Sequence, residues 1–127
     1  MRRIVVDTNA FVRFLLDDIR EQKKRTEELF QQAKHGEVQL VVPQIVIFEI
    51  AFTLLRFYKV PKQTIVKSLK VMLNIPYLEI QDRNTFQLAV NMYDKENHSL
   101  ADCFILIKAK EENAELFTFD QKLQKLL

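Results

Sequence analysis

The chain opens with Arg3-Ile4-Val5-Val6-Asp7-Thr8-Asn9, a short apolar run that ends at an acid. Three β-branched residues in succession are typical of a strand buried on both faces of a parallel sheet. A helix is expected directly afterwards, from Ala10 to Leu16. An acid at the carboxyl end of such a strand faces the crevice where parallel sheets bind ligands. Asp7 and Asn9 are also good helix N-caps, and this stretch alone favours a capping role.

The composition indicates one globular domain, residues 1–127. Hydrophobic residues make up 48% of the 127 residues, which excludes a disordered chain and allows a sizeable core. One glycine and three prolines favour long regular elements over a loop-rich or all-β fold. The single Cys103 cannot form an internal disulfide and fits a reducing, cytoplasmic location. The sequence has no apolar run of membrane-spanning length and no signal peptide pattern, so no membrane association is expected.

The order of elements predicts an α/β fold. Strands separated by helical segments form a parallel sheet whose carboxyl ends share one edge, with helices on both faces. The expected architecture is a three-layer sandwich around a short parallel sheet. Further strands are expected at 38–42, 77–80 and 115–118, and further helices at 20–35, 44–58 and 61–74, after Asp82, from Ser99 to Asn113, and at 121–127.

Glu49 is the one acid in an almost wholly apolar helix. No cation stands three or four positions away to pair with it. A buried carboxylate without a partner is costly, so such residues usually bind metal or have a distant partner. A long-range pair, for example with Arg56, is the alternative, and the metal-binding interpretation is favoured.

Two later acids occupy positions like that of Asp7. Asp102 follows Ser99 by three residues, a capping-box pattern that places its carboxylate in the first turn of a helix. Asp120 follows the predicted strand at 115–118 and precedes the last helix. Both have helix capping as an alternative role. His98 is interpreted as a loop histidine, because no second His or Cys stands at metal-ligand spacing.

Four acids from four distant segments can converge on the edge of this sheet. All-oxygen ligands suit Mg²⁺ or Mn²⁺, and bound metal would activate a water and stabilise phosphate charge during phosphodiester hydrolysis. With those four acids set apart, the other 13 acids against 19 Lys and Arg leave +6, which suits a polyanionic partner. The chain has no Gly-rich phosphate loop, Cys-His pair or nucleophile-elbow serine, so nucleotide-triphosphate and acyl-transfer chemistry have no support.

At this point the sequence resembles the PIN-domain nucleases over its whole length, and its size is like that of single-domain VapC-type toxins. Each motif is weak alone, but the four occur in the family's order and spacing. They are Asp7-Thr8-Asn9, Pro43 followed by Glu49, Leu100-Ala101-Asp102-Cys103, and Thr118-Phe119-Asp120.

The resemblance implies a Mg²⁺- or Mn²⁺-dependent endoribonuclease that a separate antitoxin holds inactive. It implies that Asn9 and Thr118 are polar supports that orient the site. One departure is Asn97-His98-Ser99, where many members have further acids or a glycine, and it bears on metal number and substrate choice. The implied metal ligands are Asp7, Glu49, Asp102 and Asp120.

Three alternatives remain. A signalling receiver domain has a similar acidic pocket, but adjacent acids should follow its first strand. A phosphatase beginning with Asp-x-Asp should have an acid where Asn9 stands. A catalytically silent PIN-like binding module is opposed by the presence of all four acids. Separately, the apolar residues of 10–16 exceed what one core contact needs, which suggests a partner surface for an antitoxin or a second copy in a homodimer.

Overall fold

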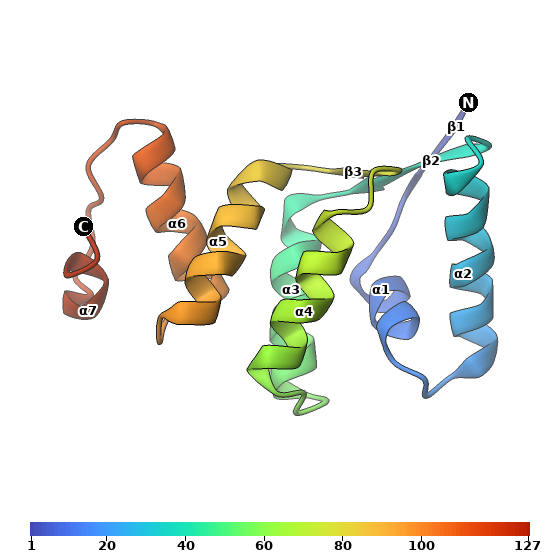
Figure 1. Ribbon diagram of the computed structural model, residues 1–127, viewed down its shortest axis with the longest axis horizontal. Helices are drawn as coiled ribbons and strands as arrows, with labels where there is room; N and C mark the ends of the chain where they lie inside the picture. Colours follow the sequence, from blue (N-terminus) through green and yellow to red (C-terminus); the bar gives the residue numbers. More distant parts are fainter. The chain divides into compact units, whose positions relative to one another are not determined.

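The computed structural model describes all 127 residues, which form two compact units (Figure 1). Unit 1 is Met1–Gln81 and unit 2 is Asp82–Leu127. Unit 1 contains β1 (Arg2–Val5), α1 (Thr8–Leu15), α2 (Arg20–Lys34), β2 (Val38–Val42), α3 (Gln44–Arg56), α4 (Lys62–Leu73) and β3 (Leu78–Ile80). Unit 2 contains α5 (Arg83–Lys95), α6 (Leu100–Glu111) and α7 (Gln121–Gln124).

The three strands form one open parallel sheet in the order β1-β2-β3. Ile4 lies opposite Leu40, and Leu40 lies opposite Leu78, so the strands are in direct register across the sheet. Each strand reaches its neighbour through two helices, which is the crossover that a parallel pair requires. The predicted α/β class with a short parallel sheet is confirmed.

One face of the sheet forms the core of unit 1. In β2 the side chains of Val38, Leu40 and Val42 are buried, whereas the residues between them are only half-buried. The prediction that the first strand is buried on both faces is wrong, because Val5 is 66% exposed. β1 is an edge strand, and of the opening apolar run only Val6, just past the strand, is fully buried.

The predicted helices are confirmed, with ends that differ by a few residues. α2 ends at Lys34, and Gly36 follows in the left-handed region at φ +78°, where a glycine has no steric cost. α6 begins after Ser99, whose hydroxyl accepts a hydrogen bond from the Asp102 N–H at 3.1 Å, as the capping pattern predicts. Asp82 precedes α5, although its side chain does not cap that helix.

The fourth strand predicted at 115–118 is wrong, since this segment has no regular structure. Unit 2 contains no other strand, and an extended segment becomes a strand only when it pairs with one. The aromatic residues of this segment are exposed instead, and Thr118 is half-buried. Phe117 and Phe119 are 86% and 88% exposed, and their rings meet edge-on at 5.3 Å.

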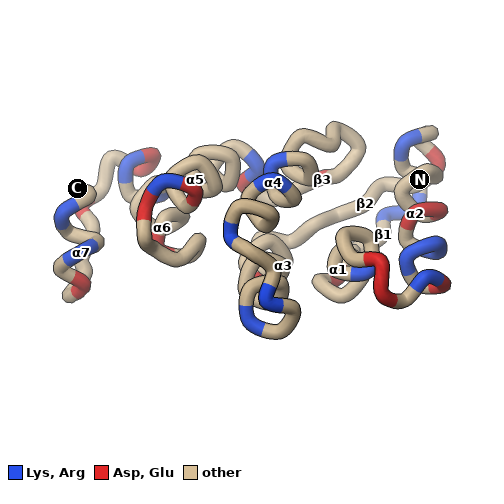
Figure 2. Tube along the Cα trace, turned by 60° about the horizontal axis from the view of Figure 1, so that its bottom comes forward, with Lys and Arg blue, Asp and Glu red and all other residues tan.

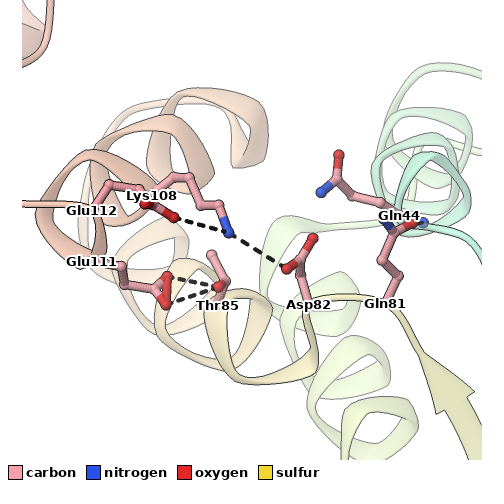
Figure 3. Close-up of polar contacts among 7 residues, drawn as sticks. All are labelled: Gln44, Gln81, Asp82, Thr85, Lys108, Glu111 and Glu112. Carbon is pink, nitrogen blue, oxygen red and sulfur yellow. Dashed lines mark hydrogen bonds and ion pairs between the residues drawn. The ribbon is translucent and has the colours of Figure 1, made fainter. Parts of the chain in front are cut away.

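Unit 2 is built on the packing of α5 against α6. The rings of Phe86 and Phe104 lie 4.8 Å apart in its core. At one end of the pair, the buried Thr85 hydroxyl donates to the Glu111 carboxylate at 2.6 Å (Figure 3). Nearby the Lys108 ammonium lies 3.5 Å from Asp82, so polar contacts fix the relative rotation of the two helices (Figure 3).

The first helix buries part of its apolar surface within unit 1. Phe11 and Val12 are buried, and the rings of Phe11 and Phe14 lie 5.5 and 4.6 Å from the ring of Phe30 on α2. Unit 1 therefore covers Phe11 and Val12, whereas Phe14, Leu15 and Leu16 are only half-buried, and the partner surface at 10–16 stays a prediction. No helix of the chain has the length and apolar content needed to cross a membrane.

Candidate metal centre

Asp7 stands directly after the first strand, as predicted. The Val6 N–H still bonds to the Val41 carbonyl, so the sheet ladder ends immediately before Asp7. One carboxylate oxygen of Asp7, Oδ1, accepts the Ala10 N–H at 3.0 Å and caps α1. The residue is exposed, and the cap uses Oδ1. The predicted ligand role of Asp7 would therefore fall to its other carboxylate oxygen.

A cleft between α1 and α2 begins at Asp7. Its volume is about 630 Å³, and Asn9 and Arg13 lie in its wall beside Asp7. The Arg13 guanidinium is held by Asp18 at 2.6 Å and by the Tyr58 hydroxyl, whereas Arg25 on α2 lines the same cleft. Polar and basic side chains thus adjoin the first predicted ligand within unit 1.

Glu49 lies in the middle of α3, and its side chain is exposed. The prediction that it is buried is wrong. The apolar residues around it in sequence divide between two faces of the helix, because Ile45 and Phe52 are also exposed while Val46 and Ile50 are buried. Glu49 is therefore accessible to an ion or a substrate from outside the core of unit 1.

The two acids of unit 2 lie close together. Asp102 is in the first turn of α6, and its side chain is 36% exposed. Asp120 caps α7, since its Oδ1 accepts the Leu123 N–H at 3.1 Å, and its own N–H donates to the Thr118 hydroxyl at 3.0 Å. Thr118 thus contacts the backbone of the acid it was expected to support.

His98 joins this pair, which sequence reasoning missed. One ligand atom from each of His98, Asp102 and Asp120 can be chosen so that all three lie within 4.8 Å of one another. His98 lies in the bend before α6 and not in the helix, so its four-residue interval from Asp102 did not predict that the two lie close together. The loop assignment of His98 is correct, and no sequence signal pointed to its place beside Asp120.

The donor set of unit 2 fits a divalent cation. Two carboxylates suit Mg²⁺ or Mn²⁺, and the imidazole adds a nitrogen donor. Around an octahedral ion with bonds of about 2.1 Å, adjacent ligand atoms lie about 3.0 Å apart and opposite ones about 4.2 Å apart, so the three side chains would have to rotate toward one another to bind one ion. A cation would also offset the repulsion between the two carboxylates.

The four predicted acids divide evenly between the two units. Asp7 and Glu49 belong to unit 1, and Asp102 and Asp120 belong to unit 2. Within unit 2 the structure brings Asp102 and Asp120 together. Within unit 1, both acids are exposed, and Asp7 and Asn9 share the cleft.

Comparison with known proteins shows similarities that extend over both units. The sequence matches the PIN domain family over residues 4–126. It is 27% identical over 124 residues to the VapC ribonuclease of Aquifex aeolicus (strain VF5), an alignment that covers 96% of this chain and 90% of the relative. The family match spans all four acids, the cleft and His98.

Proposed function

Because the chain belongs to the PIN-domain family, we propose that it is a Mg²⁺- or Mn²⁺-dependent endoribonuclease that hydrolyses RNA phosphodiester bonds. The observation that carries the proposal is the family match from residue 4 to residue 126, which includes every predicted metal ligand. The approach of Asp102 and Asp120 within unit 2 supports it, because two acids from distant segments share one donor set. The resemblance to a VapC ribonuclease indicates RNA as the substrate.

The proposed metal ligands are Asp7, Glu49, Asp102 and Asp120. A bound divalent ion would lower the pKa of a water and stabilise charge on the phosphate. Asp7 keeps Oδ2 for this role while Oδ1 holds the start of α1. Thr118 fixes the backbone of Asp120 through its hydroxyl and so orients that carboxylate.

The cleft between α1 and α2 is the proposed path of the RNA backbone. It adjoins Asp7, and Asn9 and Arg25 supply donors to phosphate oxygens in its walls. Lys and Arg residues recur along α2, interspersed with acids (Figure 2), and Arg25 of this helix lines the cleft. If such cations contact RNA phosphates regardless of sequence, the affinity for RNA should fall as the salt concentration rises.

The proposed biological role is that of a cytoplasmic toxin that is controlled by an antitoxin protein and acts as a homodimer. An exposed apolar patch on and after α3 supports a protein partner, since large patches of this kind mark interaction sites. The patch consists of Ile45, Phe52, Leu55, Phe57 and Tyr58.

The test is cleavage of structured RNAs by the purified full chain, with chelator and after addition of excess Mn²⁺. We expect cleavage in Mn²⁺ and in Mg²⁺, and none in chelator. Asp120→Asn should be inactive, and Asp17→Asn, the same change at an exposed acid outside the site, should be as active as wild type. Undiminished cleavage in chelator, with contaminating nuclease excluded, would overturn the proposal. Retention of RNA without cleavage would instead support the silent binding module.

A further inference from the structure

The His98 side chain lies beside the proposed metal ligands of unit 2 without being satisfied by them. It is only 10% exposed, so its ring is largely removed from water. Its Nδ1 lies 4.0 Å from Asp102 Oδ2, which is longer than a hydrogen bond. No side-chain nitrogen or oxygen of the structure is both buried and without a partner, so a ring nitrogen of His98 that makes no hydrogen bond reaches solvent and is accessible to an ion.

The donors around His98 are held by backbone interactions from two segments. Ser99, the next residue, caps α6, and its carbonyl accepts the Cys103 N–H at 3.1 Å. This fixes the chain between His98 and Asp102. Asp120 is fixed independently by Thr118 and Leu123. Such a donor set is preorganised, which lowers the cost of collecting it around one ion.

We propose that His98 is a nitrogen ligand of the same ion that Asp102 and Asp120 bind, so that the site prefers Mn²⁺ to Mg²⁺. The proposal rests on the proposed function, because it adds a ligand to that metal site. Mg²⁺ favours oxygen ligands, whereas imidazole suits the first-row transition metals. Replacing one oxygen donor by an imidazole nitrogen therefore favours Mn²⁺ over Mg²⁺ at equal concentration.

The alternative is that His98 only forms an ion pair with Asp102. An ion pair would need a protonated ring and would contribute no nitrogen to a metal. Both interpretations place the ring next to Asp102, so the distance alone does not separate them. A direct observation of the metal–nitrogen bond does.

The chain has two histidines, His35 and His98, which makes that observation specific. His35 is exposed and follows α2 in unit 1, outside the site. We would prepare the full-length His35→Asn protein with ¹⁵N-labelled histidine, in which His98 is the only labelled residue. Pulsed electron paramagnetic resonance of bound Mn²⁺ then reports whether a ¹⁵N nucleus is coordinated.

The expected result is a ¹⁵N coupling in the His35→Asn protein, and its absence after the further change His98→Asn. Bound Mn²⁺ without ¹⁵N coupling in the His35→Asn protein would overturn the His98 assignment, whether or not His98→Asn folds. If that protein still cleaves RNA in a chelator-sensitive way, the proposed function stands alone. If Mn²⁺ does not bind and chelator does not affect cleavage, both proposals fall.

Metal affinity gives a second readout. In His98→Asn, the dissociation constant for Mn²⁺ should rise by about 10-fold or more, because loss of even an outer partner of a metal ligand costs about 10–100-fold. The constant for Mg²⁺ should rise much less. His35→Asn should leave both constants at the wild-type value. Equal losses of Mn²⁺ and Mg²⁺ affinity in His98→Asn would contradict the predicted preference.

Discussion

Asp7 shows how one residue can support two interpretations that do not exclude each other: the capping role is observed, and the metal-ligand role stays a prediction. Its Oδ1 caps α1, and its other oxygen is free for the proposed metal. The sequence alone could identify the acid after the strand, but it could not show which carboxylate oxygen caps the helix. The prediction that Glu49 is buried was wrong, because a run of apolar residues in the sequence does not reveal that Ile45 and Phe52 lie on an exposed face of the helix.

Substitutions at Asp7 should separate capping from catalysis. Asparagine is as good an N-cap as aspartate, so Asp7→Asn should leave the free energy of unfolding in chelator nearly unchanged. Asp7→Ala removes the cap and should lower it by about 0.5–2 kcal/mol. Urea unfolding in chelator measures both, and RNA cleavage should be lost in both variants. An Asp7→Asn protein with full cleavage would leave only the capping role.

At the scale of elements, the sequence patterns that gave correct predictions were those that depend only on neighbouring residues. The cap at Ser99 and the glycine after α2 placed helix ends within a few residues, because capping and positive φ depend on neighbouring backbone groups. The segment 115–118 failed because a strand depends on a partner far away in sequence. His98 was missed for a related reason, since its proximity to Asp120 arises only from the folded arrangement of unit 2.

The packing of α5 on α6 buries Tyr93, and burial together with the nearby Cys103 raises the pKa of its phenol above the usual 10. The folded state therefore holds this proton more tightly than the unfolded state. The resulting stabilisation is complete below about pH 10 and is lost as pH rises toward the raised pKa. Stability should thus fall at alkaline pH.

Tyr93→Phe should remove that part of the alkaline loss. We expect the decrease in urea midpoint between pH 8 and about pH 10.5 to be smaller in Tyr93→Phe than in wild type. Lysine side chains titrate in the same pH range and affect all three proteins alike. Tyr77→Phe, which makes the same change at a half-buried tyrosine of unit 1, serves as the matched control. A decrease of the same size in all three proteins would show that Tyr93 does not contribute.

At the scale of the whole molecule, the four predicted acids are divided between the two compact units. Two acids lie in Met1–Gln81 and two in Asp82–Leu127, whereas the family match covers both units together. The sequence predicted the α/β class, which the structure confirms, whereas the four-acid site stays a prediction. Asp7, Asp102 and Asp120 lie at the start or end of an element, and Glu49 lies in the middle of α3. The sequence could not predict that the sheet has three strands and not four, or that His98 lies near Asp120, because both depend on which segments meet in space.

The most direct measurement is the single-turnover rate of RNA cleavage in excess Mn²⁺ for four variants and one control. The variants neutralise the proposed ligands one at a time, and Asp17→Asn makes the same change at an exposed acid elsewhere. Each ligand variant should lose at least about 100-fold in rate, because even outer partners of metal ligands cost 10–100-fold, and Asp17→Asn should match wild type. Wild-type rates in all four ligand variants would contradict a four-acid metal site. The four variants are Asp7→Asn, Glu49→Gln, Asp102→Asn and Asp120→Asn.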